Sequence, residues 1–362
     1  MKNIVLFITL LSTSLVLSQS DFKNSENQIK KLTNDEKAAG IAGGISLNGE
    51  TIWSSSSGFA DRDKELKFKT NTLSRTASIA KPMTSIAVLQ LFEKGLVDLD
   101  APIQTYVADF PIKEEGTITV KHLLNHSSGI AAYNSRKEAF DADHYDTLTD
   151  AMNVFKDREL LGTPGVEEFY TTYGYVVLGV LIERVTGLSY EEYMIKNIWE
   201  PINMLHTGVE KVAESYENKS LLYNMKKPGK IKDVEATNDL SNRVPGGGFY
   251  STVDDLLKFG NAVLNNTLIS EKTTEMMLKE QGVKYDGNPY ALGWFLYSAS
   301  GERKDIFGHG GSQAGCSSQL MIIPKRNIVV AILANTSGVW NDVIGASYAM
   351  MQEAVDYDKG LE

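Results

Sequence analysis

The segments that resemble β-strands lie near the two ends of this chain, and the segments between them are mainly helical. Near the start, residues 41–47 and 50–60 flank an Asn-Gly turn, which predicts a β-hairpin. Near the end, three more strands are expected in antiparallel succession at 293–297, 319–324 and 327–335. We therefore predict an α+β fold: an antiparallel sheet built from both chain ends and flanked by helices, with a mostly helical subdomain inserted.

The chain is long enough for two subdomains. It has 362 residues, more than one hydrophobic core usually serves. Within a domain covering 19–362, we expect an α/β part from about 25–105 and 285–362 and a helical part from about 106–284. Binding pockets are favoured at the boundary between two such parts.

The N-terminus predicts export. Lys2 is followed by an apolar stretch from Ile4 to Leu17 and then by small or polar residues. The stretch is too short to span a membrane and is typical of a secretory signal peptide, residues 1–18, cut after Ser18. The alternative is an N-terminal membrane anchor. We expect a periplasmic or extracellular protein with no stable membrane anchor after signal cleavage.

Composition and spacing exclude several classes of function. The formal net charge is −10 and no basic stripe is present, which argues against a nucleic-acid partner. The lone cysteine, Cys316, cannot form an internal disulfide. His122 and His126 are four residues apart, but the acidic neighbour of a zinc motif is missing, so no metal or cofactor is expected. The expected partner is a small-molecule or peptide substrate.

The stretch SIAKPMTSIAVLQLFEKG, residues 78–95, predicts a buried helix, because apolar residues occupy nearly every face. Proline is tolerated only in the first turn of a helix, so Pro82 places the helix start near Ser78. Gly95 can end the helix in a left-handed conformation. Ser78 and Lys81 then share one face of the first turn.

Ser78 and Lys81 have the spacing of a nucleophile and its base. A serine hydroxyl is inert at its own pKa, so a base must take its proton. Lys81 can be that base if partial burial lowers its pKa, or it can be the cation that lowers the pKa of a neighbouring base. By spacing alone, a helix-capping serine with a solvated lysine is the commoner interpretation. The chain has a second Ser-x-x-Lys, Ser20–Lys23, with no apolar run behind it.

A tyrosine offers a second candidate base. Tyr170 lies in PGVEEFYTTYGYVVLG, residues 164–179, shortly before an expected helix. A tyrosine held beside a lysine ammonium could titrate low enough to act as a general base. Packing is the alternative, because the chain has 16 tyrosines.

A glycine-rich segment offers the third candidate. His309, Gly310 and Gly311 lie at or near the start of an expected strand, where glycines let a substrate approach the backbone. The N–H of Ser312 could pair with that of Ser78 as an oxyanion hole. A glycine-rich turn between strands is the alternative.

In this order, SIAK, the Tyr170 segment and the His309 segment resemble the three motifs of the class C β-lactamase-like, penicillin-binding-protein-like serine hydrolases. Other segments are also similar, including TVKHLLNHSSGI and GGGFYSTVDDLLKF, and the resemblance spans roughly residues 40–335. This family includes class C β-lactamases, D-Ala-D-Ala carboxypeptidases, D-amino-acid peptidases and carboxylesterases. The resemblance implies a β-lactamase/transpeptidase-like fold and acyl-enzyme chemistry.

The resemblance also implies roles for single residues. Ser78 would be the acylated nucleophile, Lys81 its base partner and Tyr170 the second general base. The oxyanion hole would be formed by the backbone N–H groups of Ser78 and Ser312. The substrate would be contacted by Thr172, His309, Gly310 and Gly311.

Two positions depart from the family pattern. Thr172 stands where Asn is usual, and its hydroxyl has a shorter reach than an amide, which can donate to and accept from a substrate amide at once. His309 stands where the family has a lysine and is largely neutral near pH 7. We therefore expect a secreted peptidase, D-Ala-D-Ala carboxypeptidase-like, or an esterase. The alternatives are a true β-lactamase and a non-catalytic penicillin-binding-like protein.

Overall fold

The computed structural model describes residues 22–139, 143–234, 238–285, 287–297 and 305–362. The expected signal peptide, residues 1–18, lies outside this part of the chain. Among the described residues, no helix combines the length and the apolar character that crossing a membrane requires.

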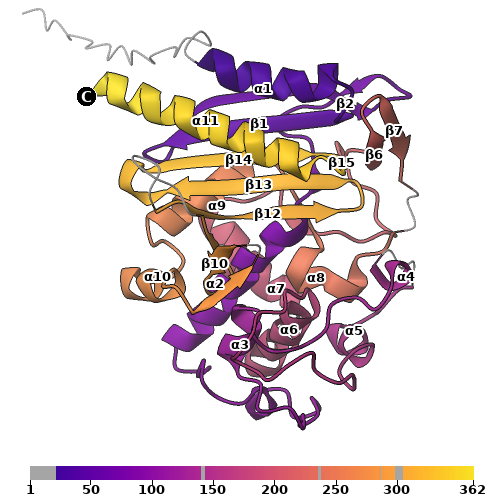
Figure 1. Ribbon diagram of the computed structural model, residues 1–362, viewed down its shortest axis with the longest axis vertical. Coiled ribbons are helices and arrows are strands. Elements are labelled where there is room, and N and C mark those ends of the chain that lie inside the picture. Colours follow the sequence, from indigo (N-terminus) through magenta and orange to yellow (C-terminus); the bar gives the residue numbers. More distant parts are fainter. Residues whose placement is uncertain (1–21, 140–142, 235–237, 286, 298–304) are drawn as a thin grey trace, which may run out of the picture.

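An antiparallel sheet at the centre of the fold takes strands from both ends of the chain (Figure 1). The strands lie in the order β3–β2–β1–β14–β13–β12–β11–β10–β9. Their bounds are β1 Gly40–Leu47, β2 Glu50–Asp61, β3 Leu66–Lys67, β9 Val283–Tyr285, β10 Asn288–Tyr290, β11 Phe295–Leu296, β12 Phe307–Gln313, β13 Cys316–Ile323 and β14 Ile328–Ala334. Because β1 pairs directly with β14, the prediction of a sheet built from both chain ends is confirmed.

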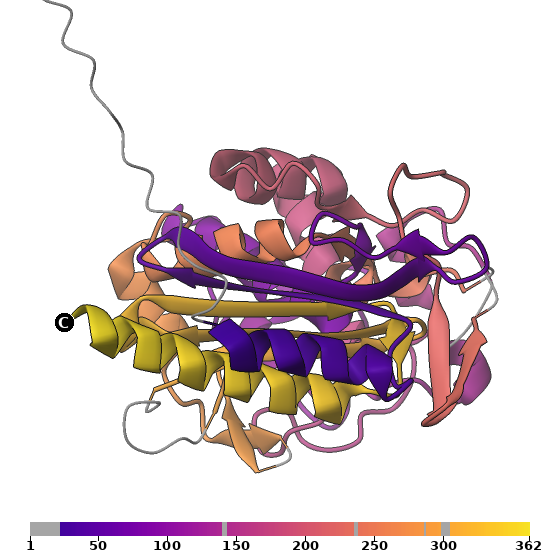
Figure 2. The same ribbon diagram turned by 90° about the horizontal axis from the view of Figure 1, so that it is seen from above.

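Helices cover both faces of this sheet. Figure 2 shows α1 (Lys23–Asn34) and α11 (Trp340–Leu361) side by side on one face. On the other face, α9 (Val253–Leu264) contacts β1, β13 and β14. Strand β14 therefore buries alternate side chains in two cores, Val330 in the core beneath α11 and Val329 in the core shared with α9. This double burial explains why its sequence is a continuous apolar run.

The helical part is organised around α2 (Ala80–Glu93), which is buried on almost every side, as predicted. It contacts α6, α7 and α8. The other helices of this part are α3 Val120–Leu124, α4 Arg136–Ala139, α5 Leu148–Asn153, α6 Tyr173–Thr186, α7 Tyr190–Met194, α8 Val244–Gly247 and α10 Glu271–Met277.

The division of the chain at residues 106 and 284 does not follow the packing. Helix α2 lies before residue 106 but packs among the helices, and α9 lies before residue 284 but packs on the sheet. The sequence boundary marks where the strands of the central sheet stop, whereas the apolar face of each helix decides what it packs against.

Two small sheets lie outside the central one. One has the order β15–β6–β7, and the other has the order β4–β8–β5. Their bounds are β4 Ser74–Arg75, β5 Gly208–Val209, β6 Tyr223–Lys227, β7 Lys230–Asp233, β8 Phe249–Ser251 and β15 Thr336–Ser337. The sheet that contains β4 holds the chain immediately before Ser78 in place.

Candidate active site

Ser78 is presented by a strained turn at the start of α2. A 3₁₀ turn, Ala77–Ile79, precedes the α-helix, and Ala77 has a φ of 49°. A positive φ costs a non-glycine residue on the order of 1–3 kcal/mol, so the surroundings must hold it. Strand β12 does so at Gly311, where a Cβ would lie only 2.9 Å from Cβ of Ala77. Ser78 remains half-buried at this helix end.

Lys81 lies beneath Ser78 with its amine fully buried. Its Nζ donates to Ser78 Oγ at 3.0 Å, to the carbonyl oxygen of Gly246 at 2.8 Å and to Thr172 Oγ1 at 3.4 Å. Burial, helped by the charge of Arg243, holds the pKa of Lys81 well below the usual 10.5. A neutral amine so placed can accept the serine proton. This geometry favours Lys81 as the base.

Tyr170 closes the other side of Ser78. Nζ of Lys81 lies 4.8 Å from the centroid of the Tyr170 ring. Burial raises the pKa of Tyr170 well above 10.0, although a side-chain hydrogen bond with Ser78 acts in the opposite direction. The expectation that Tyr170 titrates low beside Lys81 is therefore wrong, because burial is the largest influence on its pKa. Tyr170 is a phenol, suited to donate a proton rather than to accept the first one.

Ser312 lies on β12 with its N–H directed away from β13. The hairpin closes with Gln313 opposite Cys316 and only two residues between them, so this pair exchanges hydrogen bonds. Bonded pairs alternate along an antiparallel ladder, so the next pair, Ser312 with Ser317, does not exchange them. On its outer side, β12 pairs with β11 only at Phe307 and Gly308. Among the described strands, the N–H of Ser312 therefore has no ladder partner.

His309 is the third residue of β12, near the start of the strand as expected. It is 1% exposed, its Nε2 lies 3.0 Å from Tyr290 Oη, and its Nδ1 lies 2.6 Å from the carbonyl oxygen of Gly310. Burial, with a contribution from Lys81, lowers the pKa of His309 to about 3. A fixed cation is therefore absent from this position at neutral pH, as the histidine in the motif suggested.

The glycines of the third motif serve packing as well as access. A Cβ on Gly310 would lie 2.5 Å from Nε1 of Trp340, and one on Gly311 would lie 2.4 Å from the carbonyl oxygen of Thr76. The sequence suggests that these glycines leave space for the substrate. On the side where a Cβ would stand, protein atoms fill that space. Gly311 in particular lets β12 lie against the nucleophile turn.

Sequence reasoning missed several residues that surround Lys81 and Tyr170. The spacing of His126 suggests only a metal ligand, yet the centroid of its buried ring lies 4.2 Å from that of Tyr170. Glu168 has a buried Oε1 with no hydrogen-bond partner among the described residues, and burial raises its pKa to about 7. In the sequence, the segment containing Gly246 stands out only by its similarity to the family. His122, the other suspected ligand, completes a capping box with Thr119 at the start of α3.

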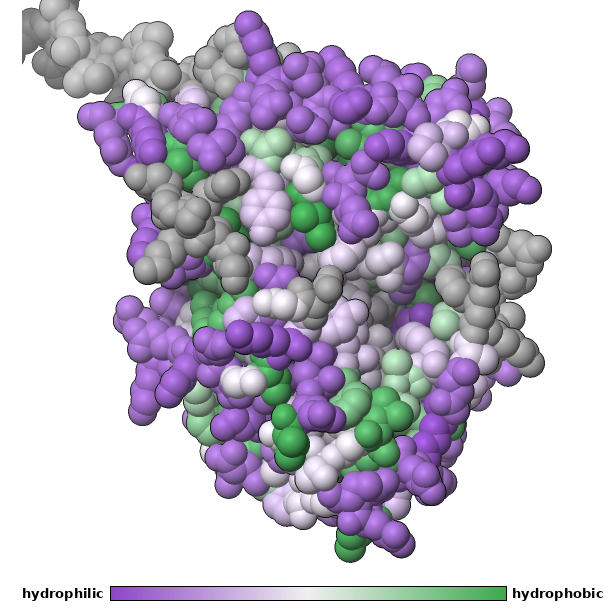
Figure 3. All heavy atoms as spheres, viewed as in Figure 1, coloured by the Kyte–Doolittle hydropathy of each residue, from purple (hydrophilic) through white to green (hydrophobic). Residues whose placement is uncertain are grey.

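The face of the molecule that holds β12 is shown in Figure 3. Strongly hydrophilic side chains cover its upper margin, over α1, whereas weakly polar and apolar side chains gather across the middle, below β12. Aromatic rings lie beside the site, where the ring centroid of Tyr170 is 4.9 Å from that of Tyr285 and 6.4 Å from that of Phe295. Aromatic rings therefore surround Tyr170 on this side of the site.

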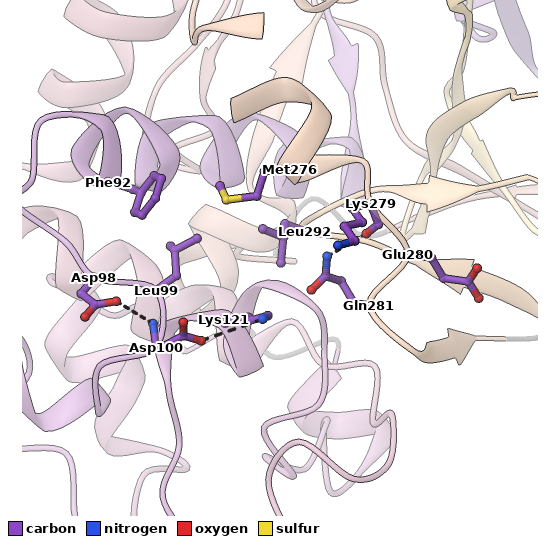
Figure 4. A pocket seen from close by; sticks show the side chains of 10 residues that line it. All are labelled: Phe92, Asp98, Leu99, Asp100, Lys121, Met276, Lys279, Glu280, Gln281 and Leu292. Atoms are coloured by element: carbon purple, nitrogen blue, oxygen red, sulfur yellow. Dashed lines mark hydrogen bonds and ion pairs between the residues drawn. The ribbon is translucent and has the colours of Figure 1, made fainter. Parts of the chain in front are cut away.

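A separate cavity of about 450 Å³ lies near the other end of α2 (Figure 4). Its walls combine apolar and charged side chains: Phe92, Asp98, Leu99, Asp100, Lys121, Met276, Lys279, Glu280, Gln281 and Leu292. Phe92 follows Lys81 by eleven residues, or about 16 Å along a helix. The cavity shares no lining residue with the Ser78 site.

Comparison with known proteins places the chain in a family. The family model described as "Beta-lactamase" matches residues 26–353. The human serine beta-lactamase-like protein LACTB, mitochondrial, is 26% identical over 93% of this chain and 80% of that protein. The putative penicillin-binding protein PbpX of Bacillus subtilis is 31% identical over 77% of this chain and 69% of that protein.

A solved structure of a penicillin-binding protein homologue has a similar fold. The octameric penicillin-binding protein homologue from Pyrococcus abyssi superposes with a TM-score of 0.76, is 28% identical, and is matched over 87% of this chain and 73% of that one. The expected β-lactamase/transpeptidase-like fold is confirmed. Together with the family model, these matches show that the chain belongs to the beta-lactamase family of serine hydrolases.

Proposed function

We propose that this protein hydrolyses an amide or an ester through an acyl-enzyme on Ser78, as a peptidase or an esterase. One observation carries the proposal: a fully buried amine, Nζ of Lys81, lies 3.0 Å from Ser78 Oγ. This distance is within the reach of direct proton transfer. The depressed pKa of Lys81 supports the proposal, because it keeps an unprotonated fraction available.

In the acylation step, Ser78 Oγ attacks the substrate carbonyl carbon while its proton passes to Nζ of Lys81. The carbonyl oxygen becomes an oxyanion between the N–H groups of Ser78 and Ser312. The Tyr170 phenol then donates its proton to the leaving nitrogen or oxygen and regains one from the Lys81 ammonium. The C–N or C–O bond breaks, and both protein groups return to their starting states.

In the deacylation step, a water molecule attacks the ester carbonyl of the acyl-enzyme. Its proton passes to Lys81, directly or through the Tyr170 hydroxyl, and the same oxyanion donors hold the second tetrahedral intermediate. Collapse of that intermediate returns a proton to Ser78 Oγ and releases the acid. The two N–H groups are thus used twice in each turnover.

The substrate class follows from what His309 and Thr172 can offer. A neutral imidazole already bonded to Tyr290 provides no cation for the carboxylate of a β-lactam. Thr172 directs its Oγ1 toward Lys81 and has no amide with which to bind an acylamino side chain. Peptides without a strongly bound carboxylate, and esters, are the better candidates.

Intact-protein mass spectrometry tests this proposal. Purified protein and its Ser78→Ala variant are exposed to a panel of esters, D-Ala-D-Ala peptides and penicillins, and to a fluorophosphonate. We expect the fluorophosphonate to label the wild type only, with ester or peptide turnover exceeding turnover of a chromogenic cephalosporin. No labelling of the folded protein would favour a non-catalytic binding protein. Rapid cephalosporin turnover would favour a true β-lactamase.

Export is part of the same proposal. The apolar stretch from Ile4 to Leu17 after Lys2 supports a cleaved signal peptide. N-terminal sequencing of the protein made in its native host should give a mature chain that begins at Gln19. A mature protein that retains residues 1–18 would contradict this part of the proposal.

A further inference from the structure

Arg75 lies three residues before Ser78 and is 1% exposed. Its guanidinium has five N–H donors, and each has an acceptor. Nε bonds to Glu210, Nη1 bonds to Asn238 Oδ1 at 2.7 Å and to the carbonyl oxygen of Ala314 at 3.0 Å, and Nη2 bonds to Glu210 at 2.6 Å and to the carbonyl oxygen of Asn238 at 3.0 Å. A fully bonded, buried guanidinium has little freedom to move.

One of these acceptors belongs to the hairpin that carries Ser312. Ala314 is the first residue of the β12–β13 turn, two residues after Ser312. Arg75 therefore links β4, which precedes Ser78 in the chain, to the β12–β13 hairpin, which contains Ser312. The link is direct and uses a charged donor, which makes it stronger than an ordinary hydrogen bond.

Two side chains of β13 also link the hairpin to residues 75 and 76, in this case by donating to their backbone carbonyl oxygens. Sγ of Cys316 donates to the carbonyl oxygen of Arg75 at 2.9 Å. Oγ of Ser318 donates to the carbonyl oxygen of Thr76 at 2.7 Å. Three links thus connect residues 75 and 76 with the β12–β13 hairpin, next to the strained Ala77.

We propose that Arg75 is a positioning residue that, together with the Ser318 link to Thr76, fixes the separation between the N–H groups of Ser78 and Ser312. This inference rests on the proposed function, because it assumes that these two groups form the oxyanion hole. Donors in such a site must be held in place before reaction, and a small displacement weakens their hold on the developing charge. Arg75 holds the two backbones together without itself touching the substrate.

The neighbouring Lys219 offers a matched control. Its Nζ lies 3.2 Å from Oε1 of Glu210, so it belongs to the same ion cluster. No hydrogen bond joins it to the hairpin in the described structure. Lys219→Gln removes one ionic partner of Glu210 and leaves the bond between Arg75 and Ala314 in place.

The experiment compares Arg75→Lys with Lys219→Gln on an activated ester. Active sites are first titrated with a fluorophosphonate, so that unfolded protein is not counted. We expect Arg75→Lys to lower kcat per titrated site by about 10-fold or more with KM nearly unchanged, less than the 10²–10³-fold loss of a whole oxyanion donor. The affinity of a boronic acid, which forms a tetrahedral adduct on the serine, should fall in parallel. Lys219→Gln should change neither quantity.

A merely structural role would give a different result. Arg75→Lys would then lower the melting temperature and the fraction of titratable sites, with kcat per site and boronate affinity unchanged. That outcome would overturn the proposal. If the wild type itself turns over no ester or peptide, the proposed function fails instead, and the two failures are distinct.

A gentler variant keeps the inference testable where Arg75→Lys does not fold. Ser318→Ala removes only the hydroxyl that bonds to Thr76, and Ser317→Ala is its control, since Ser317 Oγ is buried without a partner among the described residues. We expect Ser318→Ala, but not Ser317→Ala, to lower kcat and boronate affinity together by about 3-fold or more. Equal behaviour of the two variants would overturn the proposal.

Discussion

The carbonyl oxygen of Gly246 lies 2.8 Å from Nζ of Lys81, closer to the amine than Ser78 Oγ is at 3.0 Å. A backbone acceptor is fixed in space, so it sets the direction of the lysine side chain. Gly246 is itself packed tightly, because a Cβ there would lie 2.6 Å from Cγ2 of Thr172. The absence of a side chain at Gly246 therefore helps to position the amine against the serine.

Gly246→Ala should lower activity more than stability. The added methyl group must push Thr172 or the α8 backbone aside, which moves the carbonyl that holds Lys81. We expect a fall in kcat of about 10-fold to 100-fold, the size of effect that a misplaced catalytic group produces. Ester hydrolysis by titrated enzyme gives the measurement. Gly345→Ala is the control, because Gly345 lies in α11 and a Cβ there would meet nothing within 4 Å.

The rate at low substrate concentration should rise with pH and level off well before pH 10.5. Lys81 must be unprotonated to accept the serine proton, and burial holds its pKa well below the usual 10.5. A profile of kcat/KM against pH, measured with an ester of pH-independent reactivity, shows where the rise ends. A rise centred near pH 10.5 would mean that Lys81 is an ordinary cation and not the base.

The same pKa shift predicts how stability depends on pH. Between the lowered pKa of Lys81 in the folded chain and 10.5, the unfolded chain holds a proton on Lys81 and the folded chain does not. The free energy of unfolding therefore rises with pH across this range. Lys81→Met removes the buried amine and should flatten this rise, with higher stability than the wild type near pH 7. Denaturant unfolding at several pH values is the measurement. Activity of the variant should fall by about 10²-fold or more.

The sequence predicts the central architecture well because apolar periodicity reports burial. The hairpin of β1 and β2, the last two sheet strands and the buried helix α2 are all found where expected. The region from 306 to 313 is different: it is rich in glycine and polar residues, so the sequence predicts a strand near His309 only through the motif and without bounds. Its strand character comes from pairing with β13, a long-range contact that local propensity does not contain.

The site was predictable in its residues but not in its electrostatics. The motifs identified Ser78, Lys81 and Tyr170, which the structure brings together. The direction of the Tyr170 pKa shift could not be inferred, because it depends on burial by residues distant in the sequence. The same holds for Arg75, whose acceptors Glu210, Asn238 and Ala314 come from three separate segments.

Tyr170→Phe should separate amide from ester hydrolysis. A protonated phenol matters most when the leaving group needs a proton, as an amine does and a nitrophenolate does not. We expect the variant to lose about 10²-fold or more in peptide or anilide cleavage and far less in nitrophenyl ester cleavage. Parallel steady-state assays give the two ratios. Equal losses on both substrates would instead indicate that Tyr170 acts in the attack of Ser78.

His309 should make the protein sensitive to acid. The unfolded chain binds a proton near pH 6.5, whereas burial lowers the pKa of His309 in the folded chain to about 3. Between these values the unfolded state binds more protons, so stability is present above pH 6.5 and is lost as the pH falls through this window. At about 1.4 kcal/mol for each pH unit, the loss attributable to this group could reach about 5 kcal/mol.

His309→Gln tests this directly, because an amide of similar length can still bond to Tyr290 but does not titrate. Wild type and variant are unfolded with denaturant at pH 7 and pH 4. The free energy of unfolding of the variant, relative to that of the wild type, should be higher at pH 4 than at pH 7. Acid sensitivity will not vanish, because burial also lowers the pKa of His126. If the difference were the same at both pH values, His309 would already be protonated or solvated in the native state, and a cationic group at the third motif would have to be reconsidered.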